Sequence, residues 1–158
     1  MLRPDGRLTH DLDPQDKGPQ DACGVFGVWA PGEEVAKLNY FGLFALQHRG
    51  QESAGIAVSN LQRIMVYKDM GLVNEVFDEE RLNRLHGNIG VGHVRYSTAG
   101  ASNRENAQPL IIHYIKGTLA VAHNGNLTNA VDLREKLKYS GAIFQTTIDS
   151  ETIAYYIA

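Results

Sequence analysis

The sequence predicts an α+β domain in which antiparallel β-sheet is covered by helices. Short apolar runs typical of strands fill the middle of the chain, and turn residues join some of them into hairpin-like pairs. Helical patterns lie between these pairs, an order that favours layers of helix and antiparallel sheet. The chain has 158 residues, 43% of them hydrophobic, which is the size of about one domain with enough apolar side chains for a core.

Residues 1–22 are predicted to form a disordered arm. This segment holds three of the five prolines and five aspartates, with few large apolar side chains. It lacks an apolar stretch long enough for a signal peptide. At Cys23 the composition changes abruptly, and residues 24–30 are predicted as a short buried strand.

A helix is predicted over residues 33–50, where Gly50 ends it and Gly42 weakens its pattern. Its apolar face is expected to consist of Val35, Leu38, Phe41 and Ala45. A shorter helix over residues 77–87 is expected to be capped by Asp78 and ended by Gly87. Further strands are predicted over residues 54–60, 62–71, 88–96, 109–115 and 118–123.

The end of the chain is predicted to be helical. A helix over residues 128–141 ends at Gly141, and its inward side chains are expected to be Ala130, Leu133 and Leu137. A last helix begins near Asp149. Because the chain ends inside this apolar helix, we expect the domain to be incomplete at residue 158.

The overall composition argues against several classes of function. A net charge of −3 gives no support for nucleic acid or an anionic membrane as a partner. No apolar run reaches the roughly 18 residues that would span a bilayer. The chain has one cysteine and no export signal, which favours a reducing, cytoplasmic environment. The six histidines lack metal-binding spacing, and one cysteine cannot make a zinc quartet, so no metal site is predicted.

Polar and glycine residues concentrate in a few stretches at the expected ends of strands and helices. Loops at such places often carry catalytic groups. Taken singly, Asn124-Gly125 is typical of a turn, Arg95 of a surface cation and Asp149 of a helix N-cap. The stretches cover residues 46–55, 92–100, 122–127 and 146–151.

Together with Cys23, these residues could perform one reaction. A thiol nucleophile needs donors for an oxyanion, and the side-chain amide of Asn124 with the backbone N–H of Gly125 offers two. Arg95 provides a planar fork for a carboxylate, and Asp149 a partner for an ammonium group. A substrate with both groups and a carbonyl to attack is an amino acid with a side-chain amide or ester.

The general base is not evident among the side chains. His93 and His123 are expected to be hydrogen-bonded supports, since neither occupies a motif that demands a catalytic role. The alternative base is the α-amine of Cys23, because the pKa of such an amine is about 7.7–8.0. This requires cleavage after Ala22, which would make residues 1–22 a propeptide.

Five segments resemble, in order, the class II glutamine amidotransferase domain. They are CGVFG, LQHRGQESAG, GHVRYSTAG, AHNGNLTN and the DSE of TTIDSE, so the resemblance runs from Cys23 to the end of the chain. HRGQESAG, RYSTAG and HNGNLTN are most similar to one branch of the family. Its members carry a second, phosphoribosyltransferase domain and catalyse the first committed step of de novo purine synthesis.

The resemblance implies the N-terminal nucleophile hydrolase fold, an αββα sandwich of antiparallel sheets. It implies that Cys23 attacks the side-chain amide of glutamine, forms a glutamyl thioester and releases ammonia. Asn124 and Gly125 would stabilise the oxyanion. The resemblance gives substrate-binding roles to Arg95 and Asp149, to Thr98 near the carboxylate, and to Arg49 in closure of the site.

The family also implies what the whole protein contains. The second domain would receive the ammonia and use magnesium and phosphoribosyl pyrophosphate, and relatives with a propeptide often carry an iron–sulfur cluster. We expect these cofactors to bind outside this segment, and the full-length protein to form a homo-oligomer.

Two other interpretations stay open from the residues alone. One is another class II amidotransferase, or a self-processing amide hydrolase; the hydrolase would share Cys23 but would not need the pair Arg95 and Asp149. The other is a non-catalytic glutamine-binding domain in which Cys23 is inert. Intact mass and hydrolysis of glutamine, compared with asparagine and simple amides, would separate the three.

Overall fold

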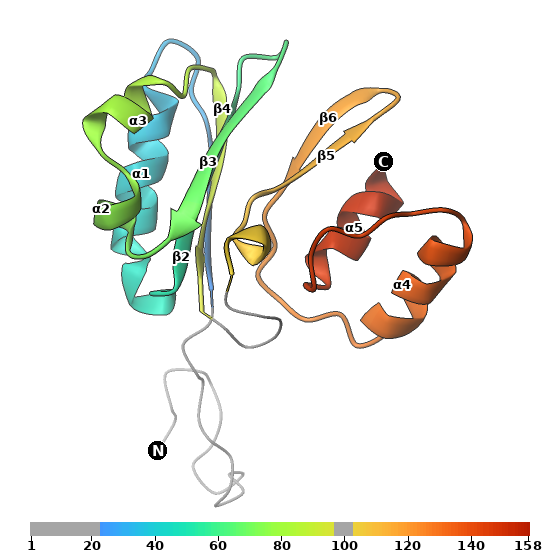
Figure 1. Ribbon diagram of the computed structural model, residues 1–158. Helices are drawn as coiled ribbons and strands as arrows, with labels where there is room; N and C mark the ends of the chain where they lie inside the picture. Colours follow the sequence, from blue (N-terminus) through green and yellow to red (C-terminus); the bar gives the residue numbers. More distant parts are fainter. Residues whose placement is uncertain (1–22, 97–102) are drawn as a thin grey trace, which may run out of the picture.

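The computed structural model describes residues 23–96 and 103–158. The predicted arm at residues 1–22 and the candidate Thr98 lie outside the described residues. Over the described ranges the chain forms four layers, with helices on the outside and two antiparallel sheets between them (Figure 1). The predicted α+β class, with antiparallel sheets covered by helices, is confirmed.

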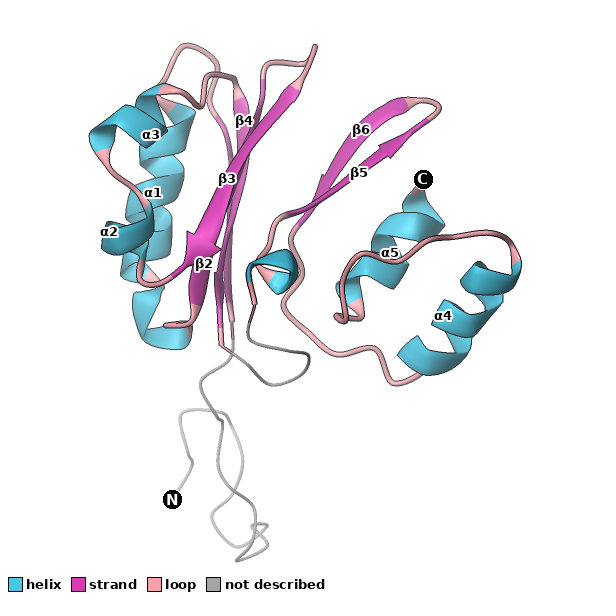
Figure 2. Ribbon diagram, in the orientation of Figure 1, coloured by secondary structure: helices cyan, strands magenta, loops and turns pink. Residues whose placement is uncertain are grey.

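The first sheet has four antiparallel strands in the order β1-β4-β2-β3. Its outer face is covered by three helices, shown on the left of Figure 2. The strands are β1 (Gly24–Trp29), β2 (Ser53–Ser59), β3 (Ile64–Met70) and β4 (Ile89–Arg95). The helices are α1 (Val35–Ala45), α2 (Val73–Val76) and α3 (Glu79–Asn83), and a 3-10 turn, η2 (Gln47–Arg49), follows α1.

The second sheet is a two-stranded antiparallel hairpin, and α5 packs against it. A 3-10 turn, η3 (Arg104–Asn106), leads into this half of the molecule. None of the helices in residues 23–96 and 103–158 is long and apolar enough to cross a membrane. The elements are β5 (Leu110–Tyr114), β6 (Gly117–Val121), α4 (Ala130–Tyr139) and α5 (Ser150–Ile157).

The face of α1 that contacts the sheet differs from the predicted one. Leu38 and Phe41 are 39% and 65% exposed, whereas Asn39 and Leu43 are fully buried. The cause lies in β4: a Cβ at Gly90 would overlap Asn39, and one at Gly92 would crowd Leu43. The two glycines therefore leave room for Asn39 and Leu43, which lie four residues apart on the helix. The spacing of apolar residues in α1 could not reveal this contact. The buried residues of α1 are Val35, Ala36, Asn39 and Leu43.

Two of the four predicted helix ends agree with the structure; α1 already ends at Ala45, and Gly50 instead follows the 3-10 turn η2. Asp78 caps α3 by accepting a 2.7 Å hydrogen bond from the backbone N–H of Arg81. Gly141 follows α4 with φ of +98°, which glycine adopts more easily than other residues. Gly87 does not end α3, which stops at Asn83; it instead lies against the backbone of Ser59, where a Cβ would overlap. The single-turn helix α2 was not predicted, because four residues are too few for a periodic signal.

The main apolar core lies between the first sheet and the three helices. The opposite face of this sheet looks toward the hairpin; it carries small and polar residues near the cavity end and apolar side chains, Ile64, Ile89 and Val91, toward the other end. Gly55 and His93 are paired across β2 and β4 on this face. A Cβ at Gly55 would overlap the carbonyl oxygen of Gln108. The two halves of the molecule therefore approach closely at Gly55.

His93 is fully buried on that face, and neither ring nitrogen has a hydrogen-bond partner among the described residues. The prediction that it is a hydrogen-bonded support was wrong. The pKa of His93 is lowered to about 4, mainly by burial; the charges of Arg95 and His123 also lower it, whereas the backbone of His123 favours the cation. At neutral pH the ring is uncharged.

Gly55→Ala should lower the free energy of unfolding by about 1–3 kcal/mol, because the two halves must move apart to admit the methyl group. Gly27→Ala is the matched control, since a Cβ at Gly27 would meet only the carbonyl of Gly90 at 3.9 Å. Urea unfolding of both variants measures the difference. Equal stability of the two variants would contradict the close contact at Gly55.

Protonation of His93 should make the protein less stable in acid. The folded pKa of about 4 lies below the ordinary value of 6.5, so stability is intact above pH 6.5 and is lost as the pH falls toward 4. The loss attributable to His93 is on the order of 3 kcal/mol. His93→Leu should remove this part of the pH dependence, whereas His86→Leu, at an exposed position, should leave it unchanged. Chemical unfolding at several pH values between 4 and 7 provides the test.

Candidate active site

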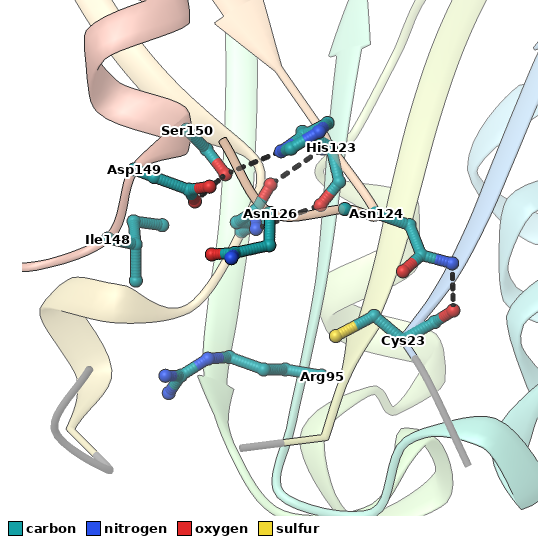
Figure 3. A pocket seen from close by; sticks show the side chains of 10 residues that line it. Cys23, Arg95, His123, Asn124, Asn126, Ile148, Asp149 and Ser150 are labelled. Atoms are coloured by element: carbon teal, nitrogen blue, oxygen red, sulfur yellow. Dashed lines mark hydrogen bonds between the residues drawn. The ribbon is translucent and has the colours of Figure 1, made fainter. Parts of the chain in front are cut away.

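A cavity of about 250 Å³ opens where the ends of the two sheets meet (Figure 3). The first sheet contributes Cys23, which precedes β1, and Arg95, which ends β4. The other half contributes the loop after β6 and the start of α5. Of the predicted residues, Cys23, Arg95, Asn124, Gly125 and Asp149 all line it. The remaining lining residues are Gln108, His123, Asn126, Ile148 and Ser150.

Antiparallel pairing places the nucleophile candidate. In the register of β1 with β4, Gly24 lies opposite Val94, so the residue before β1 comes to lie beside the end of β4. The backbone N–H of Tyr96 donates to Sγ of Cys23 at 3.3 Å. Figure 3 shows the Cys23 side chain directed into the cavity. The thiol is therefore held by backbone and faces the space where a substrate would bind.

Two side chains hold the backbone of Cys23. Nδ2 of Asn124 donates to the Cys23 carbonyl at 2.5 Å, and Nε of Arg49 donates to the same oxygen at 3.4 Å. Asn124 thus contacts the backbone of Cys23, and both residues line the cavity; Nδ2 carries a second N–H. Arg49 contacts the backbone of Cys23 but is not among the described residues that line the cavity.

Arg95 is held by a carboxylate that the sequence did not identify. Its NH1 nitrogen lies 2.6 Å from Oε1 of Glu52, and the two side chains are 4% and 15% exposed. A buried guanidinium needs such a partner, because an uncompensated buried charge is costly. Glu52 therefore orients the Arg95 side chain along the cavity. Glu52 lies in the stretch 46–55 that the sequence analysis singled out. It was not chosen as a site residue because an acidic residue in a loop is usually solvated.

Asp149 stands at the N-cap position of α5 but does not cap that helix with its side chain. Its Oδ2 instead accepts a 2.6 Å hydrogen bond from the backbone N–H of Leu127. The carboxylate therefore joins the loop after β6 to the start of α5. This contact explains how residues more than twenty positions apart form one wall of the cavity.

Sequence reasoning also missed the residues that hold the loop after β6. Oε1 of Gln108 accepts from the backbone N–H of His123 at 2.7 Å, and Nε2 of Gln108 donates to the His123 carbonyl at 3.2 Å. Nδ1 of His123 lies 3.1 Å from the hydroxyl of Ser150. His123 is thus a hydrogen-bonded support, as predicted. No local pattern marked Gln108 or Ser150 for these contacts.

A family model and the most similar curated proteins both relate this chain to glutamine amidotransferases. The model of the glutamine amidotransferase domain matches residues 78–158. Amidophosphoribosyltransferase of Synechococcus elongatus is 55% identical over 95% of this chain and 31% of its own length. That of Synechocystis is 58% identical over the whole chain and 33% of its length, and that of Bacillus subtilis is 46% identical over 89% and 30%.

Solved structures of such enzymes share the fold. One described as the allosteric regulatory enzyme of purine biosynthesis superposes with a TM-score of 0.78 at 46% identity, over 84% of this chain and 29% of that one. A B. subtilis glutamine phosphoribosylpyrophosphate amidotransferase with ADP and GMP gives 0.76 at 45% identity, over 84% and 28%. The αββα architecture expected from the resemblance is confirmed.

The chain spans about a third of the length of the curated relatives that it matches. Within that span the family model covers half of the chain, and the relatives align with nearly all of it. The chain therefore belongs to the family of glutamine amidotransferase domains.

Proposed function

We propose that the cavity hydrolyses the side-chain amide of glutamine, and that the ammonia supplies phosphoribosylamine formation from phosphoribosyl pyrophosphate, the first committed step of de novo purine synthesis. One observation carries the glutaminase part: a single cavity joins a thiol, an amide donor pair, a cation and an anion. The names of the relatives support the pathway. Phosphoribosyl pyrophosphate and magnesium are assigned to the part of the longer relatives outside the aligned segment.

Substrate binding uses the two charges in the cavity. The fork of Arg95, fixed by Glu52, donates hydrogen bonds to the α-carboxylate of glutamine, and the Asp149 carboxylate accepts from its α-ammonium. These contacts orient the side-chain amide toward Cys23 at the other end. Because the bound amide is held next to the thiol, attack becomes effectively unimolecular.

The chemical steps use the α-amine of Cys23 as the base, after cleavage of the peptide bond that follows Ala22. The amine takes the thiol proton, and Sγ attacks the amide carbon of glutamine. The resulting oxyanion accepts hydrogen bonds from the Asn124 side chain and the Gly125 backbone N–H. Collapse of this intermediate breaks the C–N bond, and the α-ammonium returns its proton to the amide nitrogen, which leaves as ammonia. Water then hydrolyses the glutamyl thioester and releases glutamate.

The domain assignment follows from this mechanism. Residues 1–22 are a propeptide whose removal frees the base, and residues 23–158 are the glutaminase segment. Among the other lining residues, Gln108 and His123 support the donor loop, and Ser150 contacts both His123 and Asp149.

The mature protein is expected to begin at Cys23, which the intact mass of the purified protein will show. Cys23→Ala should abolish glutamine hydrolysis, and Cys23→Ser should keep at most weak activity, because a hydroxyl is the poorer nucleophile. Full glutaminase turnover by protein that still carries residues 1–22 would exclude the α-amine as the base. Equal hydrolysis of asparagine and glutamine would favour a less selective amide hydrolase.

Arg95→Lys and Asp149→Asn should each raise KM for glutamine about 30-fold or more, because the first removes the bidentate fork for the carboxylate and the second removes the charge that pairs with the ammonium. Lysine keeps the charge of Arg95 but not its fork. Arg84→Lys and Asp132→Asn, both at exposed positions, are the matched controls and should keep the KM of the parent. Steady-state glutaminase assays supply KM. If the two cavity variants also kept it, neither residue would bind the substrate.

A further inference from the structure

The walls of the cavity belong to two sheets that do not share a strand pairing. Cys23 and Arg95 are attached to the first sheet, whereas Asn124 and Gly125 follow β6 of the second. The proposed reaction needs the thiol and the oxyanion donors at a fixed separation. Some contact between the sheets must therefore set that separation.

The backbone around Gln108 is fixed to the first sheet. The Gln108 carbonyl lies so close to Gly55 of β2 that a Cβ there would overlap it. Beside it, Nζ of Lys68 on β3 donates to the carbonyl of Ala107 at 2.5 Å. Gln108 itself is 5% exposed. Its main chain therefore has little freedom to move relative to β2 and β3.

The side chain of Gln108 is fixed to the second half. It binds both the N–H and the carbonyl of His123, at 2.7 and 3.2 Å, as a neighbouring strand would. Because one contact accepts and the other donates, the amide has a single orientation. His123 precedes Asn124, and its ring lies against Gly125, where a Cβ would crowd Nε2. Holding His123 thus holds both oxyanion donors.

We propose that Gln108 is a positioning residue that spans the two sheets and aligns the oxyanion donors of Asn124 and Gly125 with the thiol of Cys23. This rests on the proposed glutaminase function. The residue acts through the backbone of His123, so its loss should slow the chemical step more than it weakens glutamine binding by Arg95 and Asp149.

The test compares Gln108→Met and Gln108→Glu with the parent protein. Methionine keeps the length of the side chain but loses both hydrogen bonds, whereas glutamate keeps the acceptor geometry and loses the donor. Gln62→Met, in an exposed turn, is the matched control. Thermal unfolding confirms that each variant is folded before the assays.

In Gln108→Met we expect kcat for glutamine to fall about 100-fold, because misplaced donors stabilise the oxyanion poorly. KM should stay within about threefold of the parent value, as expected when only a transition-state contact is lost. Alkylation of Cys23 by iodoacetamide should keep its rate, because that reaction forms no oxyanion. Deuterium exchange in a peptide covering residues 121–127 should become about tenfold faster. Gln62→Met should change none of these.

Gln108→Glu adds a pH-dependent readout. Its carboxylate would face the His123 carbonyl without a donor, whereas the protonated acid regains an O–H donor. The ratio of its kcat to that of the parent should therefore rise as the pH falls. A ratio independent of pH would contradict the donor role of Nε2.

The exchange measurement separates this proposal from the proposed function. If the parent did not hydrolyse glutamine, the function would fail, and faster exchange in Gln108→Met would still support the contact across the sheets. Unchanged exchange and unchanged kcat in Gln108→Met would overturn the positioning role. A rise in KM at constant kcat would also overturn it, because Gln108 would then act as part of the binding wall.

Discussion

The close approach of two separate sheets at Gly55 is the constraint on which the cavity depends. Strand pairing cannot set the distance between the layers, since the strands of one sheet do not pair with those of the other. Contact of backbone with backbone sets it instead, because only a residue without a Cβ admits the Gln108 carbonyl at that point. Lys68 adds a hydrogen bond from the same sheet to Ala107. The main apolar core lies elsewhere, under the helices of the first half, so different residues form the core and the cavity.

The charges in the cavity are compensated within the protein. Glu52 accompanies Arg95, and the Asp149 carboxylate accepts the N–H of Leu127. Buried charges are costly unless they are paired or hydrogen-bonded. The same partners also orient the charges, because the ion pair fixes the guanidinium and the Leu127 contact fixes the carboxylate. A substrate with a carboxylate and an ammonium group therefore meets charges that are already oriented, which reduces the entropy lost on binding.

The sequence predicted the layers of the fold and five residues that line the cavity, but not the contacts that arrange them. Cys23, Arg95, Asn124, Gly125 and Asp149 were recognisable because nucleophile, donor and charge chemistry restricts which residue types can serve. Gln108 and Glu52 were not, because an amide or a carboxylate in a loop has no local signature of its distant partner. The face of α1 was wrong for the same reason: it follows from glycines in β4, fifty residues further along the chain. Thr98 and the arm at residues 1–22 stay predictions.

The contacts that hold Cys23 do not depend on a free N-terminus. Its carbonyl accepts from Asn124 and Arg49, and its sulfur accepts from the N–H of Tyr96. All three contacts involve the carbonyl or the sulfur of Cys23, and none involves its backbone nitrogen. The residue can thus take its final place while its nitrogen is still part of a peptide bond. In the mechanism proposed above, folding and activation are then separable: the contacts that hold Cys23 do not require its free amine, which cleavage after Ala22 would supply.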